Sequence, residues 1–266
     1  MTSVTYSDLV LLNKDMIENV QQLIEYGADK IELMMDGDKW DEMDRLFEPV
    51  AAQLNKLPVS FSIHPPAWDI NLTSENKAIR EASFHEYRKA IEFAAMIDAS
   101  HVVIHPGFCF SPVFDKRLAQ RRAKESIIRL CEIARPLGVN LAVENVGYSG
   151  TALFTQEEFI HFLDGIDEIA GYLIDVGHAQ LDGWDVPSVL VSVKDRLMAL
   201  HLHDNMAEVD DHLPIGAGKM DWQKILDTIR DHQIQCDYIL EYAPGTALEA
   251  LRTGKEFLQQ SVLISQ

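Results

Sequence analysis

The alternation of short apolar runs with amphipathic windows predicts a single (β/α)₈ barrel, and three observations carry this prediction. Eight strand-like runs alternate with eight helix-like windows over 266 residues, which is the order and length of such a barrel. No Pro-, Gly- or Ser-rich linker interrupts the series, so we expect one domain over residues 1–266. No predicted strand is followed by a Gly-rich phosphate-binding turn, which disfavours an open doubly wound sheet.

The predicted strands are rich in β-branched and apolar residues and lie between turn signals. They cover residues 4–10, 30–35, 59–64, 101–105, 140–146, 172–176, 197–203 and 237–242. Each connection is long enough to hold a helix, which implies parallel strands joined by right-handed crossovers.

The predicted helices carry apolar residues at helical spacing. They cover residues 13–26, 40–55, 74–97, 117–137, 156–163, 187–193, 221–233 and 247–260. The first is expected to stop at Gly27 and the second before Pro58, because glycine and proline are common helix terminators.

Composition and charge narrow the classes of function. Hydrophobic residues make up 47% of the chain, and no apolar run is long enough to cross a bilayer. No secretory leader is visible, and the three cysteines lack metal-ligand or redox spacing, so we expect a cytoplasmic protein with reduced thiols. The net charge of −19 repels nucleic acid and anionic membranes, although a local basic patch could still overrule it.

One basic cluster lies at the start of the helix predicted over residues 117–137. We interpret it as a solvated helical face and not as a nucleic-acid site. It consists of Lys116, Arg117, Arg121, Arg122 and Lys124.

Acidic residues and histidines gather where the predicted strands end. His201 and His203 have the spacing that places two side chains on one side of a strand. Six of the ten histidines of the chain belong to this set. The strand-end residues are His64, His105, Glu144, Asp175, His201 and Glu241, and His178, His203, Asp210 and His212 follow closely. Because catalytic groups of a barrel lie at the carboxyl ends of its strands, these side chains are expected to converge.

Converging carboxylates and imidazoles favour a divalent metal. Buried acids would otherwise repel each other and lose their hydration, whereas a cation neutralises them. Mixed carboxylate and imidazole ligands suit zinc, manganese, iron or cobalt, and the lack of nearby cysteine disfavours a structural zinc. Taken singly, each residue could equally form a salt bridge or cap a strand. The residues two positions earlier should also face the barrel interior: Ser62, Val103, Ala142, Leu173, Ala199 and Ile239.

The order of these motifs resembles the xylose isomerase-like TIM barrels, also called AP endonuclease family 2. The resemblance extends from the second predicted strand to the eighth. It rests on His-Pro-Gly at 105–107, Glu144-Asn145, Asp175-x-x-His178, His201-x-His203-Asp204 and the segment Asp210-Asp211-His212 followed by Gly216-x-Gly218.

The family's sugar isomerases and epimerases imply one metal bound by Glu144, Asp175, His201 and Glu241. In such enzymes the metal contacts a carbonyl and its neighbouring hydroxyl and stabilises an enediolate. Glu144 and Glu241 would then act as base and acid, and His178 would position a substrate oxygen. We expect Asp204, Trp68, Phe108 and Tyr148 to contact substrate, and His203 either to contact substrate or to support the ligands from behind. The chain departs from the ketose epimerases at Ala207, where they carry an arginine, and this departure disfavours a free ketose as the substrate.

A resemblance to endonuclease IV implies a second hypothesis for the function, phosphodiester cleavage at a multinuclear zinc site. Its three-zinc site uses nine ligands, and all nine have counterparts here: His64, His105, Glu144, Asp175, His178, His201, Asp210, His212 and Glu241. The charge and the short loops disfavour gripping a duplex, so we favour a metal-dependent sugar or sugar-phosphate isomerase over a phosphodiesterase. A non-catalytic metal-binding barrel is the third alternative. We therefore expect one to three divalent ions, zinc or manganese, and a small carbohydrate substrate. We expect no membrane partner, and the sequence is compatible with a homo-oligomer.

Overall fold

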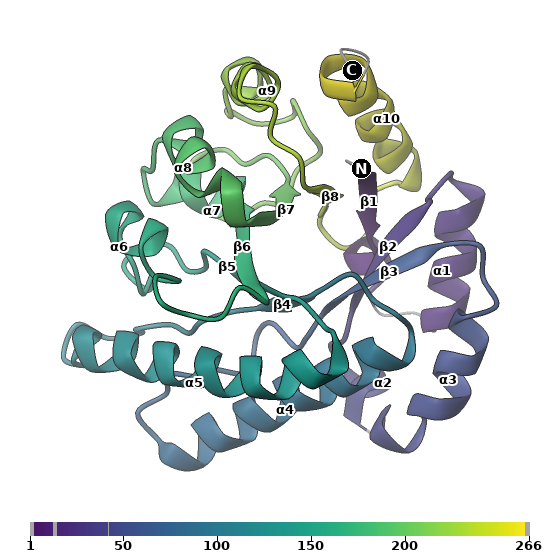
Figure 1. The fold of residues 1–266 in the computed structure, drawn as a ribbon. Coiled ribbons are helices and arrows are strands. Elements are labelled where there is room, and N and C mark those ends of the chain that lie inside the picture. The colour runs from purple at the N-terminus through teal and green to yellow at the C-terminus, as the bar shows by residue number, and fades with distance from the viewer. Residues whose placement is uncertain (1–2, 13–14, 42, 264–266) are drawn as a thin grey trace.

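The computed structural model describes residues 3–12, 15–41 and 43–263 and forms a closed barrel of eight parallel strands (Figure 1). Neighbouring strands pair in chain order, and β1 closes the ring on β8. The predicted barrel is therefore confirmed. The strands are β1 (Ser3–Ser7), β2 (Lys30–Met34), β3 (Ser60–His64), β4 (Val102–Ile104), β5 (Leu141–Glu144), β6 (Ala170–Asp175), β7 (Leu197–Leu202) and β8 (Asp237–Leu240).

The helices surround the strands on the outside of the barrel, as Figure 1 shows. Several begin at a residue whose side chain accepts a backbone hydrogen bond, such as Asp15, Asn76 and Thr155. The longer helices are α1 (Met16–Glu25), α3 (Phe47–Leu54), α4 (Lys77–Met96), α5 (Lys116–Leu137), α8 (Val186–Val193), α9 (Trp222–Asp231) and α10 (Leu248–Leu258). The shorter ones are η1 (Asp8–Leu11), α2 (Asp38–Asp41), η2 (Met43–Arg45), α6 (Gln156–Ile160), α7 (Val176–Leu181), η3 (Lys194–Arg196) and η4 (Gln259–Leu263).

The helix predicted over residues 40–55 is wrong as one continuous element. The chain forms α2, η2 and α3 there, and α3 begins two residues before Pro49. Proline has no backbone N–H for a helical hydrogen bond and is tolerated in the first turn, so a helix begins near Pro49 and cannot run through it.

Seven of the eight predicted strands extend one to three residues past their observed carboxyl ends, and in two of them a helix begins at that point. The first stops at Ser7, whose hydroxyl accepts from the amide of Leu9 and starts η1. The sixth stops at Asp175, which accepts from the amide of His178 and begins α7. The sequence does not indicate α7, because six residues are too few to show a helical period.

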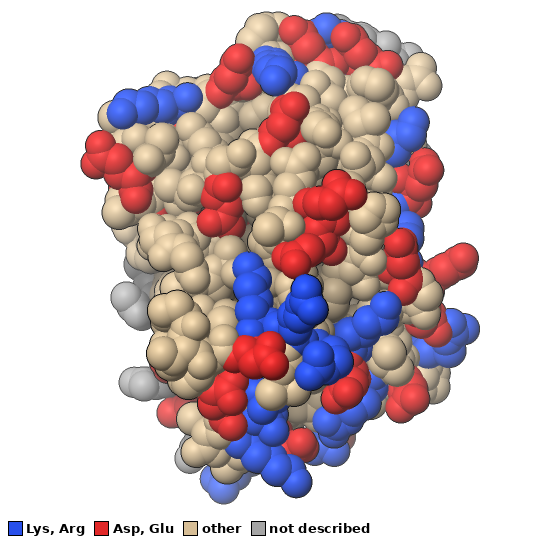
Figure 2. Space-filling view, turned by 90° about the vertical axis from the view of Figure 1, so that its left-hand side faces the viewer, with Lys and Arg blue, Asp and Glu red and all other residues tan. Residues whose placement is uncertain are grey.

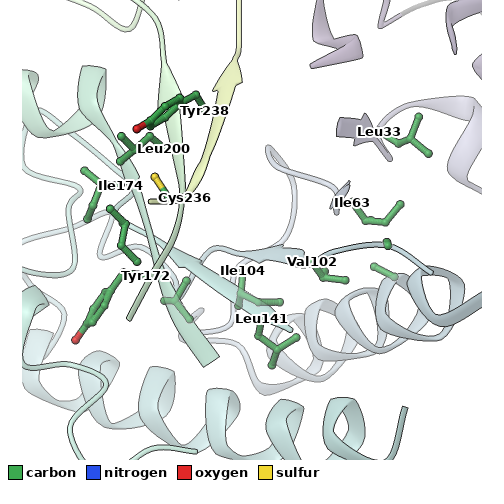
Figure 3. Packing of buried hydrophobic residues seen from close by; sticks show 14 of the residues in the cluster. Leu33, Ile63, Val102, Ile104, Leu141, Tyr172, Ile174, Leu200, Cys236 and Tyr238 are labelled. Carbon is green, nitrogen blue, oxygen red and sulfur yellow. The ribbon is translucent and has the colours of Figure 1, made fainter. Parts of the chain in front are cut away.

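Alternate residues of the strands build two separate cores. Side chains that point outward, among them Leu33, Ile63, Ile104 and Leu200, pack in the main core (Figure 3). Side chains that point inward fill the barrel: Val103, Ala142, Leu173, Ala199 and Ile239 form their own cluster. This agrees with the predicted inward parity, and each of these residues lies two positions before a candidate ligand.

Basic and acidic side chains lie close together on the helical surface of the barrel. Figure 2 shows Lys and Arg side chains gathered in the lower part of one face, with acidic side chains among them. On α5, Arg122 pairs with Glu75 at 3.0 Å and Lys124 donates to the carbonyl of Asp164. No helix in the described part of the chain is long and apolar enough to cross a membrane.

Candidate metal centre

The four residues predicted to bind one metal meet at the mouth of the barrel. Glu144, Asp175 and His201 lie at or near the ends of β5, β6 and β7, and Glu241 directly follows β8. The Nδ1 atom of His201 lies 3.4 Å from Glu144 Oε1, 3.3 Å from Glu241 Oε2 and 3.8 Å from Asp175 Oδ2. All four side chains are buried.

This arrangement fits a divalent cation. Ligand atoms about 2.0–2.2 Å from a tetrahedral metal lie roughly 3.4 Å from one another, close to the separations around His201 Nδ1. That nitrogen is buried and has no hydrogen-bond partner among the described residues. A buried polar atom is rarely left in this state, so a cation between it and the three carboxylates satisfies all four groups.

Two further clusters adjoin this centre. In one, His105 Nε2 and His64 Nε2 lie 3.0 Å and 3.7 Å from Glu144 Oε2, the oxygen that faces away from His201. In the other, His178 Nε2 and His212 Nε2 lie 3.0 Å and 3.1 Å from Asp210 Oδ2. Each cluster brings three ligand atoms within 4.8 Å of one another, so each could hold its own ion. The structure thus brings together all nine residues predicted as ligands.

The electrostatics of the mouth reflect an excess of buried acid. Burial pushes the pKa of Glu144 up, but His201 and His105 outweigh burial and hold this pKa well below its usual range. Burial lowers the pKa of His212, yet the hydrogen bond with Asp210 and the charge of Glu241 raise it to about 9. Imidazoles with raised pKa values are already balancing negative charge, which is the task that a metal ion performs.

His203 lies beneath the mouth and not in the wall of the cavity. Its Nε2 atom is 2.9 Å from Asp175 Oδ2, and its ring stacks on that of His212 at 3.9 Å between centroids. A Cβ atom at Gly177 would lie 2.1 Å from the His203 ring, so glycine is required there. His203 therefore orients Asp175, which matches the alternative of a contact behind the ligands.

Asp204, predicted to contact substrate, is fully buried. Its carboxylate accepts hydrogen bonds from the amides of Gly216 and Met220 and from Trp222 Nε1, at 3.0, 3.1 and 2.7 Å. These contacts place it under the loop between β7 and α9.

A cavity of about 460 Å³ opens onto the proposed ligands. Trp68, Phe108 and Tyr148 line it as predicted, together with Phe110, whose ring stacks on Phe108 at 5.2 Å. The lining also includes His64, His105, Glu144, His178, Asp210, His212 and Glu241. No lining residue in the described part of the chain is Lys or Arg. The cavity thus has acidic side chains and histidines at its base and largely aromatic walls.

Sequence reasoning missed one buried acid of the site. Glu32, in the middle of β2, lies 3.2 Å from His201 Nε2. The available signal was its position: Glu32 alternates with the outward-facing Ile31 and Leu33, and a charged residue at inward parity of a buried strand is unusual.

Comparison with known proteins gives a match over most of the chain. The profile of the xylose isomerase-like TIM barrel family covers residues 20–261. An uncharacterized protein of Methanocaldococcus jannaschii is 24% identical over 265 residues, which is 96% of this chain and 87% of that protein. A probable endonuclease 4 of Thermoplasma volcanium is 28% identical over 183 residues, covering 64% of this chain and 62% of the relative. An L-ribulose-5-phosphate 3-epimerase of Escherichia coli is 24% identical over 242 residues, covering 87% and 83%.

Solved structures share the fold. A D-tagatose 3-epimerase-like protein superposes with a TM-score of 0.85 at 21% identity, covering 99% of this chain and 98% of that one. The IolI protein with a bound zinc atom gives a TM-score of 0.82 at 17% identity, with 98% of each chain covered. At these identities the likeness describes the architecture.

Proposed function

This chain belongs to the xylose isomerase-like TIM barrel family, and we propose that it is a divalent-metal-dependent isomerase or epimerase of a sugar or sugar phosphate. Glu144, Asp175, His201 and Glu241 would hold the ion, with zinc and manganese best suited to this ligand set. When bound there, the ion would supply Lewis-acid polarisation of a substrate carbonyl and its neighbouring hydroxyl.

The two glutamates supply the proton transfer. Glu144 and Glu241 come from β5 and from the end of β8, which are three strands apart, and both line the cavity. One carboxylate removes the proton from the carbon next to the carbonyl. The other returns a proton from the opposite face, which inverts that carbon. His178, which also lines the cavity, positions a substrate oxygen.

The observation that carries this proposal is the joint position of both carboxylates in a cavity of small-molecule size. A volume of about 460 Å³ with aromatic walls suits one sugar, because ring faces of Trp68, Phe108 and Tyr148 can pack on its C–H groups. A relative that acts on L-ribulose 5-phosphate and a structural neighbour resembling a D-tagatose 3-epimerase support the same class.

Phosphodiester cleavage is the second candidate, and a specific observation favours it. The clusters around Glu144 Oε2 and Asp210 Oδ2 provide ligands for two more ions, and a probable endonuclease 4 is among the relatives. Against it stand the net charge of −19 and a cavity whose described lining offers no Lys or Arg to a phosphate backbone.

The test combines metal content with two assays. The purified protein is analysed for zinc and manganese and then incubated in D₂O with D-fructose, D-tagatose, D-allulose or L-ribulose 5-phosphate. NMR follows deuterium entry at the carbon next to the carbonyl. We expect exchange in the native protein and none in Glu241→Gln. Glu125→Gln, the same change on the exposed face of α5, is the matched control and should exchange normally.

An oligonucleotide with one abasic site separates the two candidates. Cleavage of this strand by the metal-loaded protein, without exchange of any sugar, would replace the isomerase with the phosphodiesterase. Absence of any bound metal and of any thermal shift with zinc or manganese would overturn both.

A further inference from the structure

Glu32 reaches the metal centre from below. It is fully buried on β2, and its two carboxylate oxygens lie 3.2 and 3.5 Å from Nε2 of His201. His201 is likewise fully buried, and 169 residues separate the two positions in the chain. The contact of Glu32 Oε2 is a hydrogen bond at the long limit, and the buried interior strengthens the attraction between the two groups because no water competes for either of them.

The contact decides which nitrogen of His201 keeps a hydrogen. An ionised carboxylate can only accept, so Nε2 must donate, and the lone pair of the neutral ring then lies on Nδ1. Nδ1 is the atom that faces Glu144 Oε1 and Glu241 Oε2. The opposite tautomer would point a lone pair at Glu32 and an N–H at the position of the ion.

The backbone holds Glu32 in this place. It pairs in register with Ser7 on β1 and with Ser62 on β3, and its neighbours Ile31 and Leu33 are buried in the outer core. A slip of β2 by one residue would turn Glu32 out of the barrel and its apolar neighbours in. The carboxylate is thus fixed by packing that does not involve the metal ligands.

We infer that Glu32 is a positioning residue that presents Nδ1 of His201 to the metal, an inference that rests on the proposed metal centre. The other carboxylates near His201 are themselves proposed ligands, whereas Glu32 is placed on the far side of the ring. Partners of this kind hold a ligating imidazole in one tautomer and one orientation, and their loss commonly weakens metal binding roughly 10- to 100-fold.

Zinc affinity tests the inference without an activity assay. Competition with a chromophoric chelator is measured for the native protein, Glu32→Met and Glu32→Gln. We expect Glu32→Met to bind zinc roughly 10- to 100-fold more weakly, and Glu32→Gln, which keeps an acceptor oxygen, to lose less. Ser62→Ala is the matched control, because it changes the residue paired with Glu32 and leaves the acceptor of His201 intact. Its affinity should equal that of the native protein.

Proton NMR of the zinc-loaded, ¹⁵N-histidine-labelled protein supplies a second readout. The Nε2–H proton of His201 should resonate far downfield through its bond to a carboxylate and move upfield in both Glu32 variants. A role of Glu32 in packing alone would leave this proton unshifted. If Glu32→Met does not fold, Glu32→Gln carries the test.

Native affinity together with an unshifted proton in the folded variants would overturn the role of Glu32. Failure of the native protein to bind zinc or manganese would instead remove the proposed metal centre. The two failures are therefore distinguishable.

Discussion

The two ends of the barrel each bury a cluster of ionisable side chains, but they balance charge in opposite ways. We call the end of the barrel where the strands begin its floor. There the carboxylate of Asp237, at the start of β8, forms an ion pair with Lys30 at the start of β2 and accepts a 2.8 Å hydrogen bond from Ser3. At the mouth, the carboxylates of Glu144, Asp175, Asp210 and Glu241 form ion pairs only with histidines among the described residues.

One histidine at each end illustrates the difference, since the pKa of His101 is lowered and that of His64 is raised. At the floor, burial and then the charge of Lys30 lower the pKa of His101 to about 4. At the mouth, burial also lowers the pKa of His64, but the bond with Glu144 and the charge of Glu32 outweigh it and raise the pKa to about 9. The partly buried Asp237 is neutralised by Lys30, whereas buried acids that raise the pKa values of neighbouring histidines indicate a place for a cation.

The largest expected effect concerns the mouth. Zinc at about 1,000 times its dissociation constant should raise the free energy of unfolding of the native protein by about 4 kcal/mol, since it binds only the folded state. Glu144→Gln should lose most of this gain, because Glu144 contributes to two of the clusters. Thermal unfolding with and without zinc measures it. Equal gains in the two proteins would contradict the proposed centre.

At the floor, Lys30→Met should lower the free energy of unfolding by about 3 kcal/mol by leaving the Asp237 carboxylate without its cation. Lys30→Met combined with Asp237→Leu removes both charges and should recover most of the loss. Urea unfolding of both variants measures the difference. If these variants also lost the zinc-induced gain in the free energy of unfolding, the two ends of the barrel would not balance charge independently, contrary to our expectation.

His101 should make stability depend on pH. Its pKa is about 4 in the folded protein against an ordinary value of 6.5, so the unfolded chain binds more protons between these values. The free energy of unfolding therefore rises with pH across this window, by about 3 kcal/mol in total, and this contribution is constant below it. His101→Gln should flatten this part of the profile. Identical urea-unfolding profiles from pH 4 to 7 in both proteins would argue against a neutral buried His101.

The smallest effect on stability is expected in the wall of the cavity. Trp68 is 61% exposed, so Trp68→Ala should change the free energy of unfolding by no more than about 0.5 kcal/mol. Its effect should instead appear as a higher KM for the substrate identified in the exchange assay, with kcat changed less. A large loss of stability would show that Trp68 packs the structure and does not serve the cavity.

Local patterns predicted the barrel and the candidate ligands that the structure places at its mouth. Parity placed Val103, Ala142 and Ala199 inside, and strand ends located Glu144 and His201, because both properties depend on a few neighbouring residues. The start of α3 just before Pro49 was missed, although proline in the middle of a predicted helix is a signal that a helix begins close to it. The short helix α7 was also missed, because its start depends on the capping of His178 by Asp175.

Contacts between residues on different strands of the barrel could not be predicted from the sequence. Nothing local indicates that Glu32 touches His201, or that Lys30 meets Asp237 from 207 residues away. The local sequence also does not indicate that the Asp204 side chain points to the loop at Gly216 while the Asp175 side chain points to the mouth.

The sequence by itself determined which side chains face the barrel interior and which strands end in potential ligands. Only the tertiary structure decided which of those acids converge on Nδ1 of His201, which acid pairs with a lysine, and which nitrogen of His201 faces Glu32. The physical reason is that the direction of a side chain follows from the pleat of its own strand. Its partners and its charge balance follow from the closure of eight strands into one ring.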